Sequence, residues 1–166
     1  MFVVVVVSFY VLFLLGQRIV PATMYPLPDN QATSTEKLAT TTSSLPVSES
    51  EIVIEAPSGA IRAIVARTDT DRGLGLSGRD SLAADEGMLF IFPIDGPYGF
   101  WMKDMKFPID IVWIDHGHIV KGVSQKVSPE TYPNLFFPPA PIRYVLELNS
   151  GSAERFGIAS GTKLVF

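Results

Sequence analysis

The sequence predicts a mostly β fold of the α+β class. We expect a compact single-domain β-barrel or sandwich with one or two short helices, behind an N-terminal membrane-targeting helix. Two observations lead to this prediction. From Glu51 onwards, apolar residues alternate with polar ones or come in short runs, as they do in strands. Before Glu51, an apolar stretch opens the chain and a Ser/Thr/Pro-rich segment follows it.

Residues 1–22 are expected to be a signal peptide or a membrane anchor. The run from Phe2 to Leu15 carries no charge. It is short for the roughly 20 residues that span a bilayer, but it suits the core of a secretory signal. Cleavage after Ala22 and retention as an anchor both stay open, with Arg18 reaching the membrane surface in the second case. We favour the anchor, and therefore expect contact with the membrane through this segment.

Residues 23–50 read as a disordered linker, because a segment with so few large apolar residues cannot offset the entropy of ordering its backbone. Residues 51–166 form the folded domain, which is long enough for one modest core. The domain would lie on the non-cytoplasmic side of the cell envelope, either membrane-anchored or secreted.

Eight segments of the domain have the pattern of short strands. They are Ile52–Glu55, Ile61–Arg67, Met88–Phe92, Gly99–Met105, Ile109–Asp115, Ile119–Val127, Tyr144–Asn149 and Lys163–Phe166. Asp95, Gly96 and Pro97 predict a turn after the third segment, and residues 115–118 predict a tight hairpin turn after the fifth.

Two short helices complete the predicted elements. Thr68 or Asp69 can cap a helical turn that continues through Arg72. A second helix is expected over Ser152–Phe156, with Gly157 just beyond its end.

Composition excludes several kinds of function. The net charge is only −4 and the 13 Lys and Arg residues are scattered, so we expect no nucleic-acid partner. The absence of cysteine excludes disulfides, thiol nucleophiles and thiolate metal ligands. His116 and His118 flank Gly117 in the hairpin turn, where solvated histidines are expected rather than metal ligands. We therefore expect a monomer with no metal and no cofactor.

The apolar block from Phe100 to Asp115 contains a few charged residues, of which Asp110 is the most informative. Both faces of the segment around Asp110 are otherwise apolar, which predicts a central strand and a partly buried carboxylate. A buried carboxylate needs a cation or several donors, and Lys103 in the preceding segment can supply the charge. A structural ion pair that fixes strand register is the alternative to a functional site.

A further set of polar residues could converge on one pocket. Glu147 points away from the face that Tyr144, Leu146 and Leu148 share. Arg and Lys beside carboxylates can hold a polar ligand through charge-assisted hydrogen bonds. The candidate ligand-binding residues are Arg79, Glu86, Trp101, Lys103, Asp110 and Glu147. Separate surface charges remain the alternative for these residues.

Several motifs occur together in a fixed order. They are Arg72-x-x-Gly75-Leu76-Ser77-x-Arg79, Glu86-Gly87-Met88-Leu89-Phe90-x-Phe92, Phe100-Trp101-Met102-Lys103, Pro108-Ile109-Asp110-Ile111, Tyr144-Val145-Leu146-Glu147-Leu148-Asn149-x-Gly151 and Gly157-Ile158 before Gly161. In order and spacing, Ile52 to Phe166 resembles the domain of unknown function 192 family. The resemblance implies one compact β-rich α+β domain, often behind a signal peptide or anchor, and it implies no activity.

Three functional hypotheses follow. The leading one is a non-catalytic, envelope-located binding module for a small polar ligand or a partner segment. The second is a hydrolase that uses the Asp110 and Glu147 carboxylates on an envelope polymer. The third is a structural or assembly domain whose charges only stabilise the fold. No catalytic residue is assigned.

Overall fold

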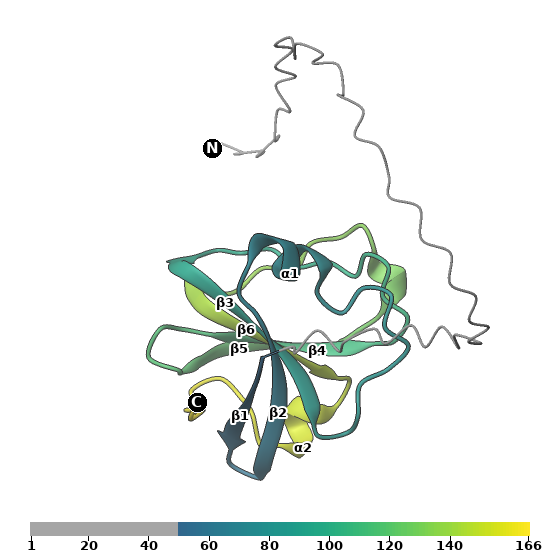
Figure 1. The fold of residues 1–166 in the computed structure, drawn as a ribbon. Helices are drawn as coiled ribbons and strands as arrows, with labels where there is room; N and C mark the ends of the chain where they lie inside the picture. Colours follow the sequence, from purple (N-terminus) through teal and green to yellow (C-terminus); the bar gives the residue numbers. More distant parts are fainter. Residues whose placement is uncertain (1–49) are drawn as a thin grey trace, which may run out of the picture. The chain divides into compact units, whose positions relative to one another are not determined.

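The computed structural model describes residues 50–166, so the predicted segment 1–22 and nearly all of the linker 23–50 lie outside the described residues. The described part holds six strands and three short helices (Figure 1). They are β1 (Glu51–Ala56), β2 (Gly59–Ala66), α1 (Asp69–Leu74), β3 (Glu86–Gly96), β4 (Ile109–Ile114), β5 (Val120–Val127), the 3-10 helix η1 (Pro129–Thr131), β6 (Ile142–Asn149) and α2 (Ser152–Arg155).

The six strands form one open sheet in the order β1-β2-β3-β6-β4-β5. All neighbours are antiparallel except β2 and β3, which are parallel and are connected through α1. The prediction of a mostly β domain with a few short helices is confirmed. The finer prediction of a barrel or sandwich is not, because β1 and β5 remain the edges of a single sheet.

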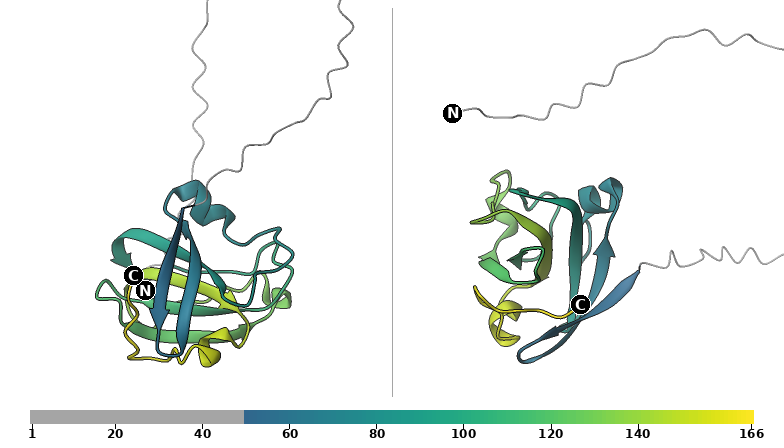
Figure 2. Two further views of the ribbon diagram at one scale, coloured as in Figure 1. Left: turned by 60° about the horizontal axis from the view of Figure 1, so that its bottom comes forward. Right: turned by 90° about the vertical axis from the view of Figure 1, so that its left-hand side faces the viewer.

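The sheet is bent, and its two halves face each other in the side view of Figure 2. β1, β2 and β3 form one half, and β6, β4 and β5 form the other. The C-terminal residues contact both edges, where isolated bridges join Lys163 to Ile119 and Val165 to Glu55. The predicted strand Lys163–Phe166 is therefore reduced to isolated bridges.

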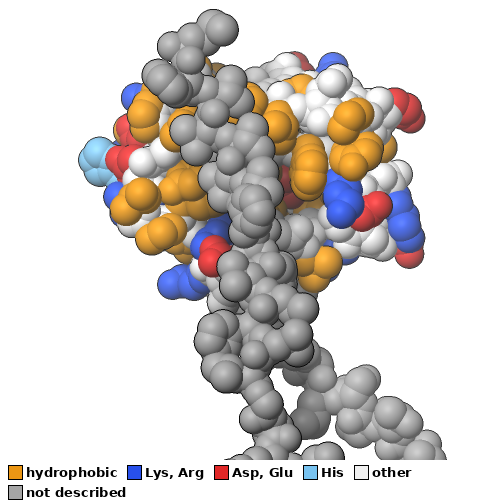
Figure 3. Space-filling view, turned by 90° about the horizontal axis from the view of Figure 1, so that it is seen from above, with side chains coloured by type: hydrophobic (Ala, Val, Ile, Leu, Met, Phe, Trp, Pro, Cys, Tyr) orange, Lys and Arg blue, Asp and Glu red, His pale blue; other side chains and the backbone are white. Residues whose placement is uncertain are grey.

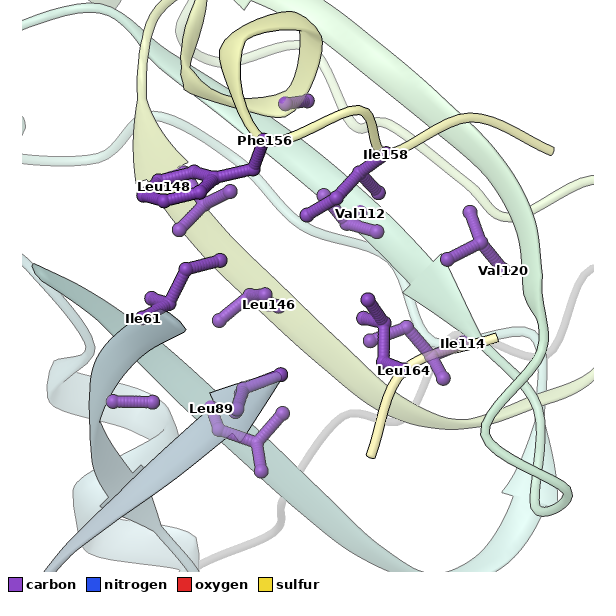
Figure 4. Packing of buried hydrophobic residues seen from close by; sticks show 13 residues of the cluster. Ile61, Leu89, Val112, Ile114, Val120, Leu146, Leu148, Phe156, Ile158 and Leu164 are labelled. Carbon is purple, nitrogen blue, oxygen red and sulfur yellow. The ribbon is translucent and has the colours of Figure 1, made fainter. Parts of the chain in front are cut away.

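The first core lies on the concave side of the bent sheet (Figure 4). Side chains from both halves meet there, with α2 and the C-terminal segment packed against them. The labelled members are Ile61, Leu89, Val112, Ile114, Val120, Leu146, Leu148, Phe156, Ile158 and Leu164. Burial of this much apolar surface supplies the main driving force for folding of the domain.

The second core lies on the opposite face of the sheet. Alternate residues of the central strands point there, including Phe90 of β3, Trp113 of β4 and Val145 of β6. Loop residues rather than a second sheet cover this face, among them Leu76, Leu82 and Met102. A face covered by loops has gaps that strand packing would close, and the candidate site lies on this face.

The two predicted helices are present. Thr68 caps α1 in a capping box, accepting from the backbone N–H of Asp71 while the Asp71 carboxylate accepts from the N–H of Thr68. α2 covers most of the predicted second helix and Gly157 follows it with φ 68°. In the described part of the chain, no helix is both long and apolar enough to cross a membrane.

Two other sequence predictions need correction. The predicted strand Gly99–Met105 forms only one isolated bridge, from Phe100 to Phe136. β3 continues to Gly96 and so includes Asp95 and Gly96 of the predicted turn, with a register shift against β6 between Ile91 and Gly96. The hairpin turn between β4 and β5 is confirmed, with the Asp115 carboxylate accepting from two backbone N–H groups of the turn.

Candidate functional site

Glu147 lies in β6 near the middle of the sheet. Its direct neighbours across the strands are Met88 of β3 and Ile111 of β4, both buried and apolar. The Leu146 and Leu148 side chains on either side point into the first core, so Glu147 points to the opposite face. The residue is only 5% exposed. A carboxyl group thus stands where the pattern of both neighbouring strands calls for an apolar side chain.

Burial raises the pKa of Glu147 from its ordinary 4.5 to about 8, because an apolar environment disfavours the charged form. The described residues provide this carboxyl with no hydrogen bond and no ion pair. Its oxygens nevertheless keep some contact with open space, since no described side-chain polar atom is both fully enclosed and without a partner. At neutral pH the group is therefore mostly a neutral carboxylic acid that can still donate and accept.

That open space is a pocket, here called the polar pocket, with about 310 Å³ of space not occupied by atoms. Three parts of the chain surround it: α1 with the segment that follows, the loop between β3 and β4, and the central strands beneath. The lining residues are Arg72, Gly73, Leu74, Gly75, Leu76, Ser77, Phe90, Phe100, Trp101, Lys103, Met105 and Glu147. Glu147 is the only acidic residue among them.

Arg72 fixes α1 to the sheet at the edge of the polar pocket. Its guanidinium donates to the carbonyls of Arg67 and Ile91, the second at 2.8 Å, and to the Asp69 carboxylate at 2.5 Å. It also lies 5.3 Å from the centre of the Phe92 ring, within reach of a cation–π contact. These contacts hold the side chain in place, with only 15% of it exposed.

The loop between β3 and β4 forms the outer rim. Phe100 and Met102 point inwards, while Trp101 is 48% exposed and contacts Tyr132 with ring centres 5.8 Å apart. The Lys103 Nζ lies 6.0 Å from the centre of the Trp101 ring. The space-filling view from the α1 side shows hydrophobic side chains in groups beside charged ones (Figure 3).

Two hydrogen bonds to backbone carbonyls hold the two walls of the polar pocket together. The Ser77 hydroxyl donates to the carbonyl of Lys103 at 2.9 Å, and the N–H of Gly78 donates to the carbonyl of Asp104 at 2.9 Å. Asp104 has a φ of 56°, a backbone conformation that non-glycine residues rarely adopt. The segment after α1 therefore holds the rim at Lys103 and Asp104, which favours a preformed site.

The structure brings together three of the six candidate residues, namely Trp101, Lys103 and Glu147. Glu86 instead accepts from Arg62 and from the backbone N–H of Ala83, both at 3.0 Å. Arg79 is half-buried and is not among the residues that line the polar pocket.

Asp110 lies on the other side of the sheet, so its predicted place in a shared pocket is wrong. It pairs with Leu148 in the β4–β6 register, and both side chains point away from the face that Glu147 occupies. Its carboxylate accepts from the backbone N–H groups of Lys126 at 2.8 Å and Ala153 at 3.0 Å. The predicted ion pair with Lys103 is likewise absent from the contacts of Asp110. Asp110 and Glu147 cannot act as one acid/base pair.

Sequence reasoning missed several residues that line the pocket, including Arg72, Ser77, Phe90 and Phe100. A signal for them was available: each belongs to the motifs on which the family resemblance rests. Most of the residues that line the polar pocket belong to those motifs.

The two histidines of the hairpin turn contact other side chains of the domain. Among residues 50–166, no three His, Cys, Asp or Glu side chains are grouped so as to hold a metal ion. His116 contacts Asp95 at 3.0 Å and is exposed. His118 is not fully solvated as expected, because its ring stacks on Phe166 with centres 4.0 Å apart and meets Tyr144 edge-on.

Comparison with known proteins gives the family. The family model DUF192, described as "Uncharacterized ACR, COG1430", matches residues 51–166. The chain belongs to this family. The suspected resemblance is therefore confirmed, and the match spans the whole of the folded domain. No curated protein matches the chain.

Two solved structures are similar to the DUF192 domain. One is a "putative transcription regulator" from Sinorhizobium meliloti 1021, with 27% identity, a TM-score of 0.68, and coverage of 72% of this chain and 95% of that one. The other is a protein of unknown function from Novosphingobium aromaticivorans DSM 12444, with 28% identity, a TM-score of 0.67, and coverage of 73% and 89% respectively. These similarities support the fold and assign no ligand.

Proposed function

We propose that this DUF192 protein is a binding module that holds a small polar ligand in the polar pocket. The observation that carries the proposal is Glu147, a buried carboxyl group without a hydrogen-bond partner among the described residues. Burying such a group without a protein partner destabilises the fold, because the small open space beside it only partly replaces its hydration. A bound ligand would supply the missing partner, which gives the polar pocket a reason to contain this residue.

The rim supports the same function. Trp101 provides a flat, half-exposed ring and Lys103 provides a cation, and both line the pocket above Glu147. Binding sites commonly combine apolar walls with a few polar groups that orient the ligand. The hydrolase hypothesis loses its second carboxylate, because Asp110 lies on the opposite face and the described lining holds only one acidic residue.

We further propose that the domain works outside the cytoplasm and is tethered through residues 1–22. Support comes from the sequence alone: the charge-free run from Phe2 to Leu15 and the Ser/Thr/Pro-rich segment after it. A ligand of the polar pocket would then be a compound of the cell envelope or its surroundings.

Native mass spectrometry of the full-length chain, purified gently in mild detergent, tests the binding function. We expect excess mass on the wild-type protein, or after incubation with envelope extract. The excess should be lost in Glu147→Met and reduced in Lys103→Ala. Lys106→Ala is the matched control, because Lys106 pairs with Asp80 on the surface and does not line the pocket.

Thermal unfolding of the same variants separates binding from a purely structural role. If Glu147 serves a ligand, Glu147→Met removes an unpaired buried polar group and should stabilise the unliganded protein by about 1–3 kcal/mol. If Glu147 serves the fold, the same change should destabilise it. A wild-type protein that carries no ligand, together with a destabilised Glu147→Met, would refute the proposed function.

A further inference from the structure

A second pocket adjoins the polar pocket on the same face. It holds about 550 Å³ of space and is lined by Arg72, Gly73, Phe92, Tyr98, Gly99, Phe100 and Trp101. Arg72, Gly73, Phe100 and Trp101 line both pockets. We call the second one the aromatic pocket. A ligand that enters one pocket can therefore extend into the other along a continuous wall.

The walls of the aromatic pocket are rigid rings. Phe92 and Tyr98 stack with centres 3.7 Å apart and planes at 11°, and Phe100 meets Phe92 edge-on at 6.3 Å. The Phe100 ring also packs edge-on against Trp113 of the second core at 5.7 Å. Rings held by such packing offer flat apolar surface at little cost in conformational entropy. The aromatic pocket suits a flat, apolar body.

The polar pocket differs from the aromatic pocket because it contains the Glu147 carboxyl group and the Lys103 ammonium group. Among residues 50–166, Arg72 and Lys103 are the only further charged residues that line the pocket, and the neighbours Met88 and Ile111 across the sheet are apolar. Arg72 is already bonded to Asp69 and to backbone carbonyls. The described residues hold Lys103 in no ion pair, and its contact to Trp101 is a long one. A neutral carboxyl donor and an available cation together favour an anion.

We propose that the ligand is an organic carboxylate with a flat apolar body. Its carboxylate would lie between Lys103 and the Glu147 carboxyl, and its body would lie in the aromatic pocket against Trp101. Lys103 supplies a charge-assisted hydrogen bond, and protonated Glu147 donates a second one. This inference rests on the proposed function, and it names the class of ligand that the site would take.

Ionisation of Glu147 should make the affinity for the ligand depend on pH. While the carboxyl is protonated it donates to the ligand, but once it ionises it repels a second carboxylate nearby. Burial places the pKa of Glu147 at about 8, so affinity for a carboxylate should fall about tenfold per pH unit above that value. A neutral ligand would show no comparable repulsion.

Titration of the full-length protein in mild detergent with matched probes tests the inference. Benzoate and 2-naphthoate each combine a carboxylate group with a flat aromatic body, which is larger in 2-naphthoate. Benzamide and 2-naphthamide are their neutral counterparts. We expect the carboxylates to bind at least tenfold more tightly than the amides at neutral pH, with 2-naphthoate the tighter of the two. We expect Lys103→Ala to lower the affinity for both carboxylates at least tenfold, and Lys106→Ala to leave it unchanged.

Two more variants assign the parts of the site. Glu147→Gln should abolish the fall in affinity at high pH, because glutamine does not ionise. Trp101→Ala should lower the affinity for 2-naphthoate more than the affinity for benzoate. Phe137→Ala is the control and should lower neither, since Phe137 is an exposed aromatic residue that lines neither pocket.

The results can overturn the ligand class without overturning the binding function. If the amides bind as tightly as the carboxylates, and Glu147→Met abolishes that binding, the binding function stands but the ligand is not an anion. If no probe binds at millimolar concentration, the carboxylate class is wrong, and the co-purified mass in native mass spectrometry still decides the binding function separately.

Discussion

Glu147 makes the stability of the domain depend on pH in an unusual direction. Its pKa is about 8 in the folded state because of burial, whereas the unfolded chain releases the proton near the ordinary value of 4.5. Between these values the folded state holds one proton more than the unfolded state. The free energy of unfolding therefore decreases as pH rises through this window, by up to about 1.4 kcal/mol per pH unit.

Urea unfolding from about pH 5 to about pH 8 measures this effect. We expect the wild-type midpoint to fall across the range and the Glu147→Gln midpoint to change much less. Asp71 and Asp85 act in a different window, because hydrogen bonds from Thr68 and Arg62 lower the pKa of their carboxyls below the ordinary 3.8. The contribution of these two carboxylates to stability is lost only as pH falls below 3.8, outside the measured range. Equal pH dependence of the urea midpoint in the wild type and in Glu147→Gln would therefore contradict the role assigned to Glu147.

Asp110 illustrates a buried carboxylate with the opposite, structural role. It connects a position of β5 to the first turn of α2 by accepting from the N–H groups of Lys126 and Ala153. Asp110→Ala leaves both N–H groups without this acceptor, and each hydrogen bond to a charged group contributes about 1.5–3 kcal/mol. We expect a large loss of stability in chemical denaturation. Because Asp110 faces away from both pockets, ligand affinity of the protein that remains folded should be unchanged, and a selective loss of binding would contradict this assignment.

At the scale of residues, the sequence predicted which way a side chain points better than which groups that side chain contacts. Alternation within β6 indicated that Glu147 points away from its apolar neighbours, and this is confirmed. The apolar surroundings of Asp110 indicated partial burial, and in the structure the residue is almost fully buried, at 1% exposure. Its donors could not be predicted, because they are backbone groups 16 and 43 positions along the chain that only the folded topology brings near.

Among the elements, the contact between β3 and β6 determines how Glu147 is presented, and Gly87 permits that contact. A Cβ atom at Gly87 would lie 2.8 Å from the backbone oxygen of Glu147 and 2.8 Å from a methyl group of Leu148. Backbone cannot move aside as a flexible side chain can, so Gly87→Ala should destabilise the domain by about 1–3 kcal/mol.

Gly73→Ala provides the matched control in thermal unfolding. Gly73 lies in α1, and a Cβ atom there would meet nothing within 4 Å. Alanine is favoured over glycine in a helix by about 1 kcal/mol, so this variant should be slightly stabilised. A Gly87→Ala protein as stable as wild type would show that β3 and β6 can separate without cost, and that the polar pocket is less preformed than its geometry indicates.

The loop between β3 and β4 alternates between buried and exposed side chains without forming the predicted strand Gly99–Met105. Phe100 and Met102 point inwards and Trp101 and Lys103 point outwards, as the period-two pattern indicates. The pattern also predicts a strand, yet only one bridge forms. Alternation reports which side chains are buried, and it does not report whether a neighbouring strand is available to pair.

At the scale of the whole domain, the order of the strands was beyond the reach of the sequence pattern. β6 lies between β3 and β4, although it comes last among the strands in the chain, and β2 pairs with β3 in parallel through α1. Eight short strand-like segments therefore suggested a barrel or sandwich, whereas six of them pair in one bent open sheet. The bend also shapes the candidate site, since one face of the sheet becomes a closed core and the other is covered by the loops that line both pockets.

The proposed place of the molecule in the cell depends on the apolar run from Phe2 to Leu15. A fusion of alkaline phosphatase after Phe166 tests it, because the enzyme is active only outside the reducing cytoplasm. We expect activity that sediments with membranes if the segment is retained, or activity in the soluble exported fraction if it is cleaved after Ala22. Replacing both Val6 and Leu12 with arginine should abolish export, because each arginine near the centre of such a segment disfavours insertion by about 2.5–3.5 kcal/mol.

Ser43→Arg is the matched control for this experiment, since it adds one of the same charges within the segment read as a linker and should leave export unchanged. A wild-type fusion without phosphatase activity would place the domain in the cytoplasm. In that case the ligand sought for the polar pocket would have to come from the cytoplasmic pool of organic acids rather than from the envelope. The geometry around Glu147 and Lys103 would be the same in either compartment, so the location decides which carboxylates the site encounters and not whether it can bind them.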